Sequence, residues 1–161
     1  MIFVTGGAGF IGSNFVIDWF GQNKKAVDEP VLVIDALTYA GNLANLDPVR
    51  GKRDLLFERQ DICDSAAILK LLCKHRPRAI VHFAAESHVD RSILGPAEFV
   101  RTNINGTFAL LEAARAYLAD LPGEERDAFR FLHVSTDEVY GSLEPDDPAF
   151  SETTAYAPNS P

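Results

Sequence analysis

Short apolar runs alternate along the chain with longer stretches in which apolar residues recur every three or four positions. Five short runs rich in β-branched and aromatic residues predict strands at residues 1–5, 31–34, 55–59, 79–83 and 131–134. The helical spacing predicts helices over residues 11–23, 65–75 and 97–118. Strands that alternate with helices form a parallel sheet covered by helices on both faces. The pattern therefore predicts an α/β fold with a doubly wound parallel sheet in the order 3-2-1-4-5.

The first predicted strand runs directly into a glycine-rich segment, and the first helical pattern follows it. The segment reads Gly6, Gly7, Ala8, Gly9, Phe10, Ile11 and Gly12. A G-x-G-x-x-G spacing between a strand and a helix is typical of a Rossmann fold that binds a dinucleotide. Glycine there permits a sharp turn, close approach of a pyrophosphate and tight helix packing, while N–H groups at the helix start face the diphosphate. The alternative is an ordinary glycine-rich turn.

The second strand ends in an acidic residue, Asp35, about twenty residues beyond the glycine segment. A carboxylate at this position accepts a hydrogen bond from the ribose 2′-hydroxyl and repels a 2′-phosphate. Asp35 therefore favours NAD over NADP as the cofactor. The alternative is a solvated loop aspartate.

The composition indicates one globular domain with a sizeable core: 161 residues, 47% hydrophobic and 24% charged. Because the net charge is −8 and no basic cluster occurs, we expect neither nucleic acid nor a membrane surface as a partner. No apolar run approaches the ~18 residues of a membrane span, and we expect no signal peptide before the glycine segment. Cys63 and Cys73 lack the spacing of metal ligands, so we expect no metal site. We expect both thiols to be buried and reduced, and the protein to be cytoplasmic.

Two further polar stretches, residues 84–92 and 135–141, also follow predicted strands. The carboxyl ends of parallel strands meet at one edge of the sheet, where ligands bind. Ala84 and Ala85 are small enough to let a cofactor approach. Asp137 and Glu138 are adjacent carboxylates that suit general acid–base chemistry. The alternative is a helix start, because residues 135 and 138 have capping-box spacing.

Several of these motifs resemble the extended short-chain dehydrogenase/reductase family of nucleotide-sugar enzymes. They comprise residues 5–12, 61–62, 82–85 and 102–103. Residues 35–42, 85–92 and 135–141 look like the 4,6-dehydratase branch, whereas related decarboxylases and GDP-mannose dehydratases tend to have serine at the position of Asp137. Besides the residues above, the resemblance implies that NAD is contacted by Leu37, Thr38, Asp61, Ile62 and Thr102.

The resemblance also implies a lyase that converts dTDP-glucose to dTDP-4-keto-6-deoxyglucose in the complete enzyme. Thr136 would hydrogen-bond the C4 oxygen, Glu138 would remove the C5 proton and Asp137 would protonate the leaving C6 hydroxyl. The residues implied to contact the sugar are Ser87, His88, Asp90 and Thr136. A homodimer is expected. The alternatives are an epimerase or decarboxylase of the same family, or an NAD-binding fragment without activity.

The last residues of the chain resemble the segment that leads into the family's Tyr-x-x-x-Lys pair. We therefore expect residues 1–161 to form an incomplete NAD-binding Rossmann domain. It would be truncated before the last strands and before a C-terminal sugar-nucleotide domain.

Overall fold

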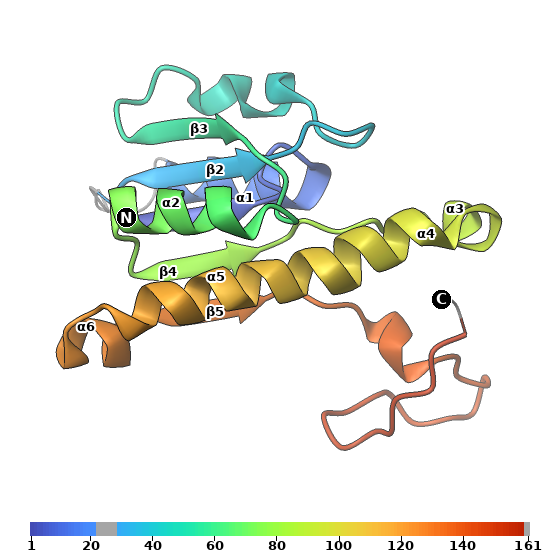
Figure 1. Ribbon diagram of the computed structural model, residues 1–161. Coiled ribbons are helices and arrows are strands. Elements are labelled where there is room, and N and C mark those ends of the chain that lie inside the picture. The colour runs from blue at the N-terminus through green and yellow to red at the C-terminus, as the bar shows by residue number, and fades with distance from the viewer. Residues whose placement is uncertain (22–28, 160–161) are drawn as a thin grey trace.

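A five-stranded parallel sheet in the order β3-β2-β1-β4-β5 forms the centre of the protein (Figure 1). The computed structural model describes residues 1–21 and 29–159. The strands are β1 (Ile2–Thr5), β2 (Val31–Asp35), β3 (Leu55–Arg59), β4 (Ala79–His82) and β5 (Arg130–His133). The predicted sheet and its strand order are confirmed, with strand ends shifted by about one residue.

A 3₁₀-helix lies between β2 and β3, and α-helices lie between the other successive strands. The α-helices are α1 (Phe10–Trp19), α2 (Ser65–His75), α3 (Val89–Leu94), α4 (Pro96–Phe99), α5 (Thr107–Ala119) and α6 (Gly123–Ala128). A π-helical segment, η2 (Val100–Gly106), joins α4 to α5, so the predicted helix over 97–118 is one continuous rod of three parts (Figure 1). The described residues also contain two 3₁₀-helices, η1 (Leu43–Val49) and η3 (Asp137–Tyr140).

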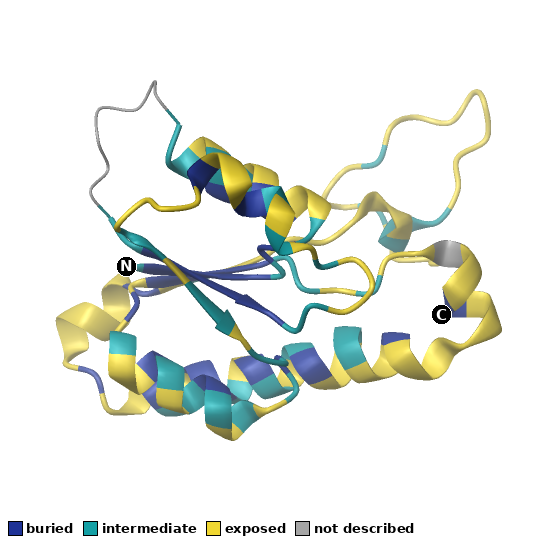
Figure 2. Ribbon diagram, turned by 90° about the horizontal axis from the view of Figure 1, so that it is seen from above, coloured by how far each residue is buried: buried dark blue, intermediate teal, exposed yellow. Residues whose placement is uncertain are grey.

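Side chains of the strands alternate between two hydrophobic cores, one on each face of the sheet. On one face Phe3 and Ile80 pack with α2 and α5, and on the other Val4 and Val33 pack with α1. Figure 2 shows the sheet between α1 on one side and α2 with the long helical rod on the other. The three central strands are buried on both faces, which explains their continuous apolar sequences.

Three details of the sequence-based prediction are wrong. The first helix ends at Trp19, and part of its predicted extension over residues 20–23 lies outside the described residues. Helical spacing groups Ile11 with Val16 on one face of the first helix, but Val16 is buried whereas Ile11, in the first turn, is 62% exposed. The thiols are not buried: Cys63 is half-buried, and Cys73 is exposed because it lies one residue beyond the inward-facing Leu72.

The carboxyl ends of β1, β2 and β4 lie at the same edge of the sheet, and the three loops that follow them start there. Within residues 1–21 and 29–159, no helix is both long enough and apolar enough to cross a membrane.

Candidate functional site

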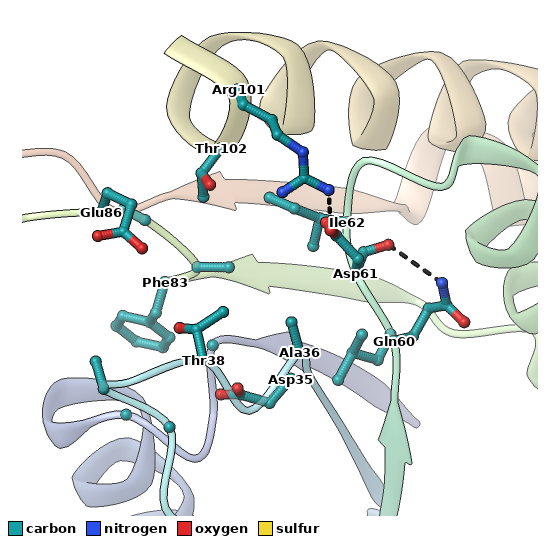
Figure 3. A pocket seen from close by; sticks show the side chains of 17 residues that line it. Asp35, Ala36, Thr38, Gln60, Asp61, Ile62, Phe83, Glu86, Arg101 and Thr102 are labelled. Carbon is teal, nitrogen blue, oxygen red and sulfur yellow. Dashed lines mark hydrogen bonds and ion pairs between the residues drawn. The ribbon is translucent and has the colours of Figure 1, made fainter. Parts of the chain in front are cut away.

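A pocket opens at the carboxyl edge of the sheet, between the loops that follow β1, β2 and β4 (Figure 3). Many residues that the sequence marked for a cofactor line this pocket. They are Gly6, Gly9, Asp35, Thr38, Asp61, Ile62, Ala84, Ala85 and Thr102. The wall also contains residues that were not predicted: Ala36, Gln60, Phe83, Glu86 and Arg101.

The glycine segment between β1 and α1 makes a tight turn that leaves its helix start uncapped. Gly6 has a φ of 69°, and a Cβ there would lie 2.6 Å from the backbone nitrogen of Ala84, so only glycine fits. A Cβ on Gly12 would lie 2.3 Å from the Gly6 carbonyl oxygen, so this glycine permits α1 to pack against the loop. Among the described residues no side chain caps the start of α1 at Gly9. Its first-turn N–H groups are therefore available to an anion.

Other residues of this segment lie outside the pocket wall. The side chains of Phe10 and Ile11 are 82% and 62% exposed, so only their backbone N–H groups suit the predicted contact. Gly7 packs below the loop, where an added Cβ would lie 2.8 Å from Val33.

Asp35 is buried at the end of β2 and ties two loops together. Its Oδ2 accepts a 2.9 Å hydrogen bond from the Ala8 N–H, and its Oδ1 accepts one of 2.8 Å from the Leu37 N–H. Since an ionised carboxylate has about four acceptor positions, capacity for ligand hydroxyls remains. Leu37 has a φ of 53°, and this left-handed residue turns the chain so that Thr38 joins the pocket wall.

An ion pair crosses one end of the pocket. Arg101 reaches from η2 to the Asp61 carboxylate, with an Nη2–Oδ2 distance of 2.5 Å (Figure 3). Asp61 also accepts a 2.9 Å hydrogen bond from the Cys63 N–H. Partial burial acts to raise the pKa of Asp61, but the hydrogen bonds from Cys63 and Arg101 outweigh it and leave the pKa below its ordinary value. This end of the pocket thus has a fixed carboxylate.

A buried histidine beneath the pocket links three elements. His82 Nδ1 lies 2.6 Å from the Thr5 hydroxyl on β1, and Nε2 lies 3.0 Å from the Thr107 hydroxyl on α5. Burial, and to a lesser extent the nearby His133, lower the pKa of His82 to about 4. The neutral ring therefore joins the ends of β1 and β4 to the helical rod.

The loop after β4 passes from the pocket wall to exposed polar residues. Glu86 lines the pocket, and its backbone N–H and C=O each form a 2.8 Å hydrogen bond with the Asn103 side chain. The predicted sugar contacts, Ser87, His88 and Asp90, follow Glu86, are exposed and lie outside the pocket wall.

The predicted acid–base group also lies outside the pocket wall. Thr136, Asp137 and Glu138 are exposed where the chain leaves β5. The Thr136 hydroxyl accepts a 3.3 Å hydrogen bond from the Glu138 N–H and lies 3.4 Å from Asp137 Oδ1. A short helix does start here, but its cap is Thr136 and not residue 135. No group of His, Cys, Asp and Glu side chains within the described part of the chain could hold a metal ion.

Comparison with known proteins places the chain in a family. Residues 3–161 match the model of the family described as GDP-mannose 4,6 dehydratase. The chain belongs to this family. One of its relatives, a dTDP-glucose 4,6-dehydratase of Xanthomonas campestris pv. campestris (strain B100), is 56% identical over 158 residues, which cover 98% of this chain and 43% of the relative. The predicted resemblance to the 4,6-dehydratase branch is confirmed.

Solved structures agree with this assignment. DesIV, a dTDP-glucose 4,6-dehydratase of Streptomyces venezuelae solved with NAD bound, has a TM-score of 0.84 and 46% identity, with 99% of this chain and 46% of that chain covered. The UDP-glucose 4-epimerase of Thermotoga maritima has a TM-score of 0.76 and 33% identity, with 99% and 45% covered. This chain thus spans about half the length of these relatives.

Proposed function

We propose that this chain binds NAD in the pocket at the carboxyl edge of its sheet. The observation that carries the proposal is the pairing of a left-handed, Cβ-free turn at Gly6 with the buried Asp35 carboxylate, both in one pocket wall. This combination suits a diphosphate beside a ribose diol. The similar DesIV structure contains bound NAD, which supports the same cofactor.

Different parts of the pocket wall suit different parts of the cofactor. The diphosphate would lie against Gly9 and the N–H groups of Phe10 and Ile11, and the ribose hydroxyls would donate to Asp35. Asp61 and Ile62 would border the adenine. The remaining wall, Ala84, Ala85 and Thr102, would lie nearer the nicotinamide. When bound, NAD⁺ would accept the hydride from C4 and later return it to C6.

For the whole protein we propose dehydration of dTDP-glucose to dTDP-4-keto-6-deoxyglucose. Asp137 supports this over the serine-containing branches, and relatives of this name are 51–56% identical. Thr136 hydrogen-bonds the C4 oxygen while C4 loses a hydride and the hydroxyl proton passes to the tyrosine of the family's Tyr-x-x-x-Lys pair. Glu138 then removes the C5 proton that the C4 ketone has acidified, and Asp137 gives its proton to the departing C6 hydroxyl, so water leaves. One carboxyl must be ionised and the other protonated for this division of roles.

We assign the sugar contacts to Ser87, His88, Asp90 and Thr136, which flank the proposed cofactor pocket along the chain. We further propose that the complete protein is a homodimer in the cytoplasm. A row of exposed apolar side chains along the helical rod supports the homodimer. The two free thiols, Cys63 and Cys73, support the cytoplasm.

A second candidate is nucleotide-sugar epimerisation, which the structural similarity to a UDP-glucose 4-epimerase favours. Incubation of the full-length protein with dTDP-glucose distinguishes the two. A 4-keto-6-deoxy sugar develops a characteristic absorbance in alkali, whereas epimerisation to a 4-epimer leaves no keto product. A C4 epimer of the substrate, formed without any absorbance in alkali, would contradict the dehydratase proposal. Calorimetric titration of the 161-residue chain with NAD⁺ tests cofactor binding separately.

A further inference from the structure

The two walls of the pocket are joined on their outer side by a direct side-chain contact. Tyr39 lies between Thr38 and Ala40, which line the pocket on the β2 side. The guanidinium carbon of Arg91, on α3, lies 3.9 Å from the centre of the Tyr39 ring, which is a cation–π contact. The loop that would contact the adenosine ribose is therefore in contact with the helix that carries a proposed sugar residue, Asp90.

Glu86, on the opposite wall, interacts with the same tyrosine. Burial, and after it a hydrogen bond to the Glu86 carboxylate, raise the pKa of Tyr39, while Arg91 acts to lower it. Glu86 is in turn held through its backbone by Asn103. We call Tyr39, Glu86 and Arg91 the loop bridge. It joins the loops after β2 and β4 to α3 with side chains alone.

Among the residues whose side chains are described, none of 88 and 90–94 lines the pocket, whereas Thr38, Ala40 and Gly41 do. A ligand in the pocket therefore meets the β2 loop directly and α3 only through neighbouring residues. Fixing one end of a stacked pair restricts the other end, and such coupling needs no change in mean structure.

We propose that Tyr39 and Arg91 are positioning residues: through the loop bridge, a dinucleotide bound against the β2 loop orders α3, and with it the residues that contact the sugar. This inference rests on the proposed NAD site. It has a chemical purpose, because the sugar can be oxidised only when the hydride acceptor is in place. With the cofactor bound, the loop bridge holds the residues that contact the sugar in place.

Hydrogen–deuterium exchange of the 161-residue chain, with and without saturating NAD⁺, tests the coupling. Residues 36–41 report direct contact. Residues 88–95 report the bridge, through amides that donate within α3, such as those of Arg91, Ser92 and Gly95. We expect NAD⁺ to slow exchange in both segments, in the second by about two- to fivefold, the factor that an exposed cation–π pair supplies.

Matched variants separate positioning from general support of the fold. Arg91→Gln and Tyr39→Ala should abolish the NAD-dependent slowing at 88–95 and retain it at 36–41. Arg91→Lys and Tyr39→Phe keep a cation and a ring, and should keep most of the effect. Arg115→Gln is the control, since Arg115 is an exposed arginine paired with Glu112 on α5.

Each outcome is decisive. If NAD⁺ slows exchange nowhere in the unchanged chain, the proposed cofactor site is wrong and the inference fails with it. If NAD⁺ slows 36–41 alone, the site stands and the bridge is overturned. Full slowing at 88–95 in Arg91→Gln would likewise overturn it. If Tyr39→Ala does not fold, shown by the absence of a cooperative unfolding transition, Arg91→Gln carries the test. The Arg91 side chain is exposed, so its replacement affects folding less.

Discussion

At the scale of single residues, Asp35 has a structural role, and we propose that it also recognises the cofactor ribose. Its carboxylate holds the N–H groups of Ala8 and Leu37, and it has acceptor capacity left for a ribose. Asp35→Ala should lower NAD⁺ affinity by roughly 1.5–3 kcal/mol, which is about 10- to 150-fold, because a hydrogen bond to a charged group is lost. Isothermal titration calorimetry measures this directly.

NADP⁺ provides the control for the recognition role. The unchanged chain should bind NADP⁺ more weakly than NAD⁺, since the Asp35 carboxylate repels the 2′-phosphate. Asp35→Ala should narrow that difference, whereas a purely structural loss would weaken both cofactors equally. Comparable affinity of the unchanged chain for the two cofactors contradicts the assignment of Asp35.

Glu138 is the residue on which the proposed chemistry depends. In the full-length protein, Glu138→Gln should preserve the first hydride transfer and block removal of the C5 proton, so NADH accumulates on the enzyme. Dehydration should slow by roughly 10²–10⁴-fold, the usual contribution of one general base. Stopped-flow absorbance of NADH and exchange of the C5 proton with deuterium measure the two steps.

Asp137→Asn and Thr136→Val serve as matched controls for this prediction. Asp137→Asn should slow loss of water and leave C5 exchange nearly intact, because it removes the acid and not the base. Thr136→Val should slow the first oxidation. If Glu138→Gln dehydrates the substrate at the wild-type rate, Glu138 is not the base. The only role left for residues 135–141 would then be to start the short helix.

The sequence indicated much of the pocket but not all of it. Gly6, Asp35 and Ala84 could be predicted because backbone geometry or position at a strand end restricts the residue type. Arg101 and Glu86 had no such signal. Their place in the wall depends on how η2 and the β4 loop lie in three dimensions, and an arginine or a glutamate at the surface has no distinctive spacing.

At the scale of elements, His82 connects β1, β4 and α5, and it should make stability depend on pH. Its pKa is about 4 in the folded protein and 6.5 in the unfolded chain. Because the folded value is the lower one, the unfolded state takes up the proton first. The contribution of neutral His82 to the free energy of unfolding is therefore fully present above pH 6.5. It is lost as the pH falls toward 4, which lowers the free energy of unfolding by up to about 3 kcal/mol.

His82→Gln should remove that part of the pH dependence while it retains polar partners for Thr5 and Thr107. Urea unfolding at a series of pH values from about 7.5 to about 4 measures it as the difference between variant and unchanged chain. His88→Gln is the control, because His88 is exposed. Parallel stability curves for His82→Gln and the unchanged chain would show that His82 does not supply the effect.

Elements with strong periodicity were predicted well, and local ones were not. The predicted bounds of α2 are confirmed, since Asp64 caps its start and the left-handed Arg76 ends it before Pro77. The sequence analysis predicts no helix at α3, α6 or η1, because six or seven residues are too few for a periodic signal. The π-helical η2 was hidden inside a longer helical pattern.

At the scale of the whole molecule, two surfaces favour association. β5 forms an edge of the sheet, and along its outer side the described chain adds no further strand. Apolar side chains also lie exposed in a row on the helical rod, at Val100, Ile104, Phe108 and Leu111. Open strand edges and contiguous apolar surfaces promote pairing with other chains. The net charge of −8 acts against both.

We therefore expect the 161-residue chain to self-associate at micromolar concentrations in sedimentation velocity experiments. If the helical rod is the contact, Phe108→Glu should shift the chain toward monomer, because a charge would be placed within an apolar interface. If the strand edge is the contact, Leu132→Lys on β5 should have that effect instead, since charged residues at an edge oppose strand pairing. Leu143→Glu, at an exposed apolar residue outside both surfaces, is the control and should change nothing. A chain that stays monomeric across this concentration range would contradict the prediction, and would mean that the negative charge outweighs both surfaces.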